Sequence, residues 1–168
     1  RWQHPTRGLL LPADFLSIVE ETGLIAELDT WVMQQAAFHL SQWRKKFPKH
    51  YDLFVNVNVD EKQLTSSEIL EEVRTVLENF VLPPSTLRLE VTEDVFRDGR
   101  GMAVERLMDL KNIGIGLVVD DFGTGYSSLS YLKRFPISTL KIDKSFVQDI
   151  PGDDEDLAIV AAILRMAS

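Results

Sequence analysis

Apolar residues recur along this chain with two different spacings, and the two spacings alternate. Steps of three and four residues, typical of helices packed on one side, predict helices at residues 11–23, 28–47, 69–80, 102–112, 127–134 and 154–164. Short runs of branched residues predict strands at residues 53–59, 86–93, 115–121 and 139–143. From the first strand onward, each predicted strand is followed by a helix, four times in succession.

This alternation predicts an α/β fold with a parallel sheet and crossover helices. Four strand–helix units suit either an open doubly wound sheet or part of a (β/α)8 barrel, and periodicity alone does not separate the two. Gly123 and Gly125 follow a strand but lack the third glycine of a dinucleotide-binding loop, which disfavours a Rossmann domain.

Composition narrows the class of protein. The chain has 168 residues, enough for one domain or most of one, and a formal net charge of -8. The negative charge argues against a nucleic-acid polymer as partner, because little basic surface is left to replace counterions. The chain has no cysteine, which excludes disulfides and fits a reducing, cytoplasmic location. Its longest apolar run, residues 157–164, is too short to cross a bilayer.

Polar residues end all four predicted strands, where parallel α/β folds build their sites. They are Asn58, Glu90, Asp120 with Asp121, and Lys141 with Asp143. Side chains alternate along a strand, so if these residues point inward, the neighbouring valines and leucines face the helices. Each residue alone has a structural explanation, such as a turn for Asp121 or a satisfied buried carboxylate for Glu90. Their coincidence at four strand ends favours a functional site.

The chemistry of this set indicates a metal site. Neighbouring strands lie about 4.8 Å apart, so an amide and several carboxylates reach one or two shared cations. Oxygen ligands select Mg²⁺ or Mn²⁺ over zinc, and a two-metal site is a standard means of hydrolysing a phosphodiester. Lys141 would supply a positive charge to phosphate or to the attacking water. Trp31 and Trp43 are expected in the core, and the place of Trp2 stays open.

Six segments of the chain form a recognisable set of motifs. The most specific is Asp120-Asp121-Phe122-Gly123-Thr124-Gly125-Tyr126-Ser127-Ser128-Leu129. The others are Arg1-Trp2-Gln3-His4-Pro5, Glu20-Glu21-Thr22-Gly23-Leu24-Ile25, Asn58-Val59-Asp60, Leu89-Glu90-Val91-Thr92-Glu93 and Leu140-Lys141-Ile142-Asp143-Lys144-Ser145-Phe146-Val147. Together, over the whole chain and in the order of that family, these segments resemble the EAL domain of bacterial cyclic-di-GMP phosphodiesterases.

The resemblance implies a modified TIM barrel, with an antiparallel first strand, that hydrolyses cyclic di-GMP to linear pGpG with two Mg²⁺ or Mn²⁺ ions. By matching position it implies the metal ligands Asn58, Glu90, Asp120 and Asp121. Lys141 and Asp121 would be catalytic, and Arg1 would contact a substrate phosphate. Glu93 would hold the loop of residues 122–128, which in this family also serves a homodimer interface.

Two departures from the family pattern qualify the resemblance. Asp60 stands where the family usually has serine. The family's Glu-Ala-Leu strand is expected ahead of Arg1, and its last strands, with another essential glutamate, after Ser168. Residues 1–168 are therefore expected to be a partial EAL domain that is inactive as a fragment, with sensory or cyclase domains attached in the full-length protein.

Two other functions compete with the phosphodiesterase. An inactive EAL domain would bind cyclic di-GMP as a receptor, or act as a regulatory dimerisation module. A different metal-dependent barrel enzyme, such as a lyase acting on carboxylates, would use a similar ligand set. Receptors of the first kind usually lose residues of the Asp-Asp loop or ligand set, and the residues visible here are intact, which favours the enzyme.

Overall fold

A parallel sheet of four strands forms the centre of the molecule in the computed structural model, which describes residues 1–50, 52–96, 101–124, 135 and 137–166. The strands are β3 (Val55–Asn58), β4 (Leu87–Thr92), β5 (Gly116–Phe122) and β6 (Thr139–Ile142), paired in that order. A doubly wound sheet reverses its strand order at a switch point, whereas this order is sequential. The predicted α/β fold is confirmed, and the order is that of a barrel segment.

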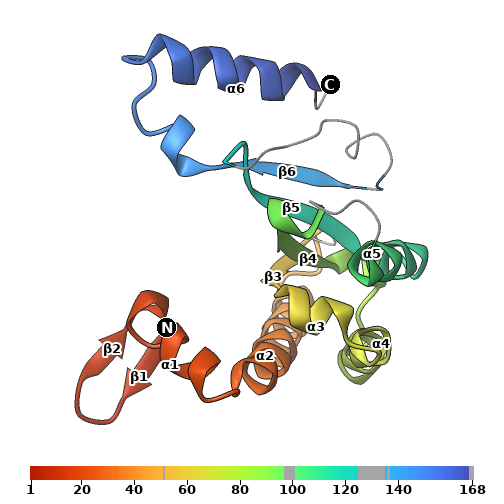
Figure 1. The fold of residues 1–168 in the computed structure, drawn as a ribbon. Helices are drawn as coiled ribbons and strands as arrows, with labels where there is room; N and C mark the ends of the chain where they lie inside the picture. Colours follow the sequence, from red (N-terminus) through yellow and green to blue (C-terminus); the bar gives the residue numbers. More distant parts are fainter. Residues whose placement is uncertain (51, 97–100, 125–134, 136, 167–168) are drawn as a thin grey trace.

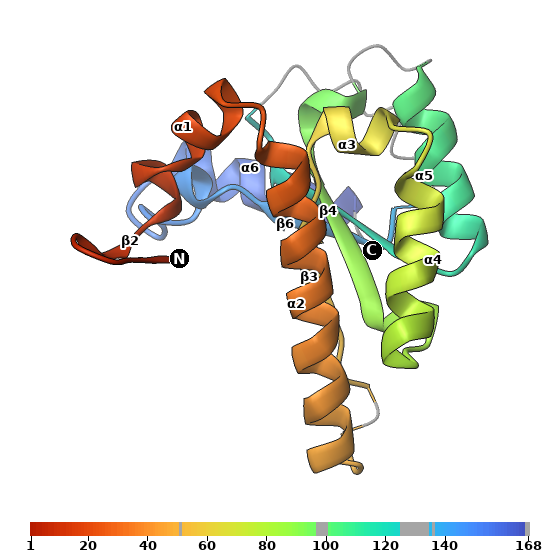
Figure 2. The ribbon, with the colours of Figure 1, turned by 90° about the horizontal axis from the view of Figure 1, so that it is seen from below.

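The helices that follow or precede these strands are α2 (Ile25–Lys46), α3 (Glu61–Thr65), α4 (Ile69–Phe80), α5 (Met102–Asn112) and α6 (Asp154–Met166). Short 3-10 turns lie at Pro12–Asp14, Pro84–Thr86, Glu93–Phe96 and Lys144–Phe146. Figure 1 and Figure 2 show α2, α4 and α5 grouped beside the sheet, with α6 beyond β6. The predicted helix at residues 127–134 lies outside the described residues.

One hydrophobic core joins the sheet to the helices. Val57, Leu89 and Val119 are at most 3% exposed and contact a cluster that includes Leu40 of α2 and Leu107 of α5. These strand residues occupy the positions that the alternation assigned to the helix side. The polar residues between them therefore project from the opposite face of the sheet.

The first 24 residues form a separate arm. An antiparallel hairpin of β1 (Trp2–His4) and β2 (Gly8–Leu10) precedes α1 (Leu16–Glu21), and Figure 1 shows it projecting away from the sheet. Its turn is held by His4, whose Nδ1 accepts hydrogen bonds from Thr6 N and Arg7 N, both 3.2 Å away. The hairpin was not predicted, since its strands are only three residues long.

Two other features differ from what the sequence predicted. Helix α3 was not predicted; it begins after Asp60, whose side chain accepts a 2.6 Å hydrogen bond from Gln63 N and so caps the helix. The prediction that Trp31 and Trp43 are core residues is wrong, because they are 56% and 47% exposed; Trp2, whose place was open, is 45% exposed. Helix α2 instead presents a narrower stripe to the core, made of Met33, Ala37, Leu40 and Ser41.

Candidate active site at the carboxyl ends of the strands

Lys141 joins two of the predicted carboxylates. Its Nζ atom lies 2.9 Å from Glu90 Oε2 and 2.9 Å from Asp120 Oδ2. The three side chains come from β6, β4 and β5, and the Glu90 side chain is only 7% exposed, against 24% for Asp120 and 42% for Lys141. A buried carboxylate requires such a partner, because desolvation of an unpaired charge is very unfavourable.

Asn56 completes the surroundings of Glu90. Its Nδ2 donates a 2.6 Å hydrogen bond to Glu90 Oε1, so both carboxylate oxygens have a donor and the side chain is fixed in orientation. The sequence analysis gave Asn56 no role in the site. The available signal was its spacing, two residues before Asn58 on the same strand.

Lys141 is a fixed cation in this cluster. Burial acts to lower the pKa of Lys141, but the hydrogen bonds and charges of Asp120 and Glu90 outweigh it, and the net shift is upward. The ammonium therefore keeps its proton at neutral pH.

Asp121 points differently from Asp120. The pairing of β5 with β6 is irregular between Val119 and Phe122, and Asp121 has a left-handed backbone with φ of 52°. A non-glycine residue in that region is strained, and such strain concentrates at functional sites. Burial, the charge of Asp120 and a hydrogen bond to Asp143 raise the pKa of Asp121. The two adjacent carboxylates therefore lie in different surroundings. Asp120 contacts Lys141, and Asp121 contacts Asp143.

Glu93 lies against the segment after β5. Its carboxylate is buried, with the residue 7% exposed, and Oε2 accepts a 3.0 Å hydrogen bond from Gly123 N. Gly123 has φ of 103°, and a Cβ atom there would lie 2.9 Å from Phe146 Cε2, so glycine is required. Residues 125–128 of the predicted loop, with its suggested dimer interface, lie outside the described residues.

The remaining predicted residues lie apart from the Lys141 contacts. Asn58 is exposed at the end of β3, in register with Glu90 on β4. Arg1 is exposed at the start of the hairpin arm, and no hydrogen bond or ion pair joins it to the cluster within the described part of the chain. The structure therefore brings together Glu90, Asp120 and Lys141, adds Asn56, and leaves Arg1 separate.

The donor set can be tested against the implied metal. Asn58, Glu90, Asp120 and Asp121 offer amide and carboxylate oxygens, the ligands that Mg²⁺ and Mn²⁺ prefer. Among the residues that the structure describes, no three His, Cys, Asp or Glu side chains are grouped so as to hold a metal ion. Mg²⁺ is commonly bound by one or two carboxylates together with water and substrate phosphates. The donor chemistry fits that mode.

Comparisons with known proteins agree with the geometry. The chain is 42% identical over 167 residues to the cyclic di-GMP phosphodiesterase NbdA of Pseudomonas aeruginosa, covering 99% of this chain and 21% of that protein. It is 40% identical over 166 residues to MucR of the same organism, a bifunctional diguanylate cyclase/cyclic di-GMP phosphodiesterase, covering 99% of this chain and 24% of MucR. The chain thus spans about a quarter or less of these relatives.

A solved structure and a family profile extend the comparison. The structure of the PaMucR phosphodiesterase in complex with cyclic di-GMP matches with a TM-score of 0.91 and 41% identity, covering 99% of this chain and 66% of that chain. EAL domains have a TIM-barrel-like fold, in agreement with the sequential parallel strands seen here. The family profile described as EAL domain matches residues 1–168. The chain therefore belongs to the EAL domain family.

Proposed function

We propose that this chain belongs to a metal-dependent phosphodiesterase that hydrolyses cyclic di-GMP to linear pGpG. The observation that carries the proposal is the contact of Lys141 with Glu90 and Asp120 at the carboxyl ends of three parallel strands. The names of NbdA and MucR and the cyclic di-GMP bound to PaMucR support the same substrate.

In the proposed reaction, water bonds to phosphorus, the P–O3′ bond breaks and the leaving oxygen takes up a proton. Each residue of the cluster has a separate role in it. An ammonium has three N–H donors, and Lys141 uses two of them for Glu90 and Asp120. The third is available to a phosphate oxygen or to the attacking water, which it would orient and polarise. Asn56 and Lys141 hold Glu90 in one orientation.

Mg²⁺ or Mn²⁺ would be held by Asn58, Glu90, Asp120 and Asp121. When bound, such ions lower the pKa of water and neutralise charge on the phosphoryl group. Asp120 already contacts Lys141. We therefore assign its neighbour Asp121, at the carboxyl end of β5, a catalytic role as well as the role of a metal ligand.

Further roles follow from the family. Arg1 would bind a substrate phosphate once the hairpin arm is positioned over the site. Glu93 would hold the loop after Asp121, supported by its hydrogen bond to Gly123, and that loop would contribute to a homodimer. Attachment to sensory or cyclase domains is supported by the greater length of NbdA and MucR. A cytoplasmic location is supported by the absence of cysteine. No helix within the described ranges is long and apolar enough to span a membrane.

The test is an assay of pGpG formation from cyclic di-GMP by the longer protein to which this chain is proposed to belong, with binding of the dinucleotide measured in parallel. Formation of pGpG should require Mg²⁺ or Mn²⁺ and stop when the metal is chelated. Lys141→Met and Glu90→Gln should each reduce turnover by about a hundredfold or more, as for removal of a group that stabilises transition-state charge. Glu105→Gln, an exposed position on α5, is the matched control and should leave turnover unchanged.

Two results would contradict the proposal in different ways. Tight binding of cyclic di-GMP with no pGpG, under any divalent metal, would assign the chain to a receptor. Undiminished turnover by Glu90→Gln would show that the cluster is not the reaction site.

A further inference from the structure

A second group of polar side chains lies at the opposite, amino-terminal edge of the sheet, where the strands begin. A hollow of about 210 Å³ opens there between the starts of β4, β5 and β6 and the end of α5. The residues that matter for its chemistry are Ser85, Arg88, Lys111, Gly116, Ser138 and Thr139. None of the described residues that line the hollow is acidic.

Arg88 and Lys111 give this hollow a positive charge. Within the described part of the chain, neither has a carboxylate within 4.0 Å. The chain as a whole carries a net charge of -8, so a wall whose charged residues are both basic differs in sign from the molecule around it.

Both cations are held in place. The Arg88 guanidinium lies over the Phe54 ring, with Cζ 3.4 Å from the ring centroid. The Arg88 stem crosses Gly116 so closely that a Cβ atom at that position would lie 2.7 Å from Arg88 Cγ. Lys111 Nζ donates a 3.1 Å hydrogen bond to Ser138 Oγ. Because both side chains are already ordered, less of their conformational entropy is lost when an anion binds.

We propose that Arg88 and Lys111 form a binding site for a small phosphate-like anion, either inorganic phosphate or a phosphate monoester. Arginine recognises phosphate with a planar fork of N–H groups, lysine adds a point charge, and the hydroxyl groups of Ser85 and Thr139 are further donors. The volume is below that of typical ligand pockets, about 300–1,000 Å³, so the hollow suits a phosphate group and not a whole dinucleotide.

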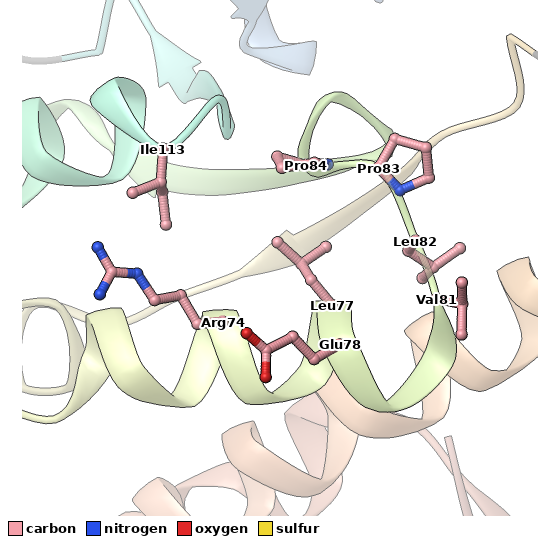
Figure 3. Close-up of a pocket in the computed structure, with 8 residues that line it drawn as sticks. All are labelled: Arg74, Leu77, Glu78, Val81, Leu82, Pro83, Pro84 and Ile113. Atoms are coloured by element: carbon pink, nitrogen blue, oxygen red, sulfur yellow. The ribbon is translucent and has the colours of Figure 1, made fainter.

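A larger hollow nearby has a different character. It measures about 660 Å³ and is lined mainly by apolar side chains between α4 and the Pro83-Pro84 turn, as Figure 3 shows. Its charged residues are Arg74 and Glu78, one of each sign, so it lacks the charge excess that the Arg88–Lys111 hollow has.

The proposal is tested by adding inorganic phosphate to the ¹⁵N-labelled chain and following backbone amide shifts, against sodium chloride at equal ionic strength. Saturable shifts at Gly116, Ser138 and Thr139 are expected with phosphate only. Lys111→Met and Arg88→Met, which keep the aliphatic stems, should each weaken binding about tenfold, the effect of losing one hydrogen bond to a charged group. Lys45→Met, at an exposed position on α2, is the matched control and should bind as the parent does.

A third variant tests the geometry without removing charge. Gly116→Ala places a Cβ where the Arg88 stem lies and should also weaken phosphate binding, whether or not the methionine variants fold well. Guanosine monophosphate in a parallel titration separates the two sources of phosphate: similar affinities identify the phosphate group as the recognised element. Identical shifts with chloride, or unchanged binding in Gly116→Ala and both methionine variants, would each overturn the proposal.

Discussion

The dependence of Glu90 on Lys141 gives a prediction about stability that does not require the chemical reaction. Lys141→Met keeps most of the aliphatic stem but removes the cation from a carboxylate that is 7% exposed. Loss of one partner of a buried pair typically costs about 3–5 kcal/mol. The Lys141 side chain is itself 42% exposed, so water replaces part of what is lost. The expected loss in the free energy of unfolding is therefore about 2 kcal/mol.

A second substitution should restore part of that stability. In the Lys141→Met background, Glu90→Gln removes the charge that has lost its partner, and the double variant should be about 1 kcal/mol more stable than Lys141→Met alone. Urea unfolding followed by circular dichroism, near neutral pH and physiological salt, measures the stability of the parent, Lys141→Met, Glu90→Gln and the double variant. If the double variant is less stable than Lys141→Met, Glu90 does not depend on the lysine charge and the reasoning is refuted.

Three further substitutions probe other contacts. Burial and neighbouring carboxylates raise the pKa of Asp29 from 3.8 to about 6, so the folded state binds its proton more tightly and this contribution to stability falls as pH rises through that window. Asp29→Asn should therefore stabilise the fold by about 1 kcal/mol above pH ~7 and not below pH ~4, measured by thermal unfolding across pH; equal gains at both pH values would contradict this. Gly123→Ala brings a Cβ to 2.9 Å from Phe146 and should lower stability by about 2 kcal/mol, whereas Gly101→Ala, whose Cβ would meet no atom of the described residues within 4 Å, should change it by a few tenths. Asn56→Ala removes a 2.6 Å hydrogen bond to Glu90 and should weaken Mn²⁺ binding, followed by electron paramagnetic resonance, about tenfold; unchanged affinity would remove Asn56 from the site.

The sequence predicted the sheet well because strand alternation reports directly on burial. Val57, Leu89 and Val119 were assigned to the helix side from parity, and each is buried in the core. The same parity placed Glu90 and Lys141 on the other face, where they meet. Adjacent parallel strands bring equivalent positions together, so residue type at the strand ends was sufficient to propose that they form one cluster.

The helices were less predictable in detail. Helical spacing on α2 includes Trp31 and Trp43 as readily as Met33 and Ala37, because amphipathic periodicity does not say which edge of an apolar stripe meets the sheet. The three-residue strands of the hairpin gave too short a pattern to detect, and its turn is fixed by a single histidine side chain.

By itself, the sequence determined the alternation of strands and helices, the face on which each strand residue lies, and the acidic and basic residues available at the strand ends. Tertiary structure alone decided which donors face one another. It placed Asn56 on Glu90, turned Asp121 toward Asp143 through a left-handed backbone, and folded Arg88 across Gly116. The physical reason is that periodicity fixes the direction of a side chain from its own strand, whereas register and local backbone conformation fix the distance to side chains of other strands.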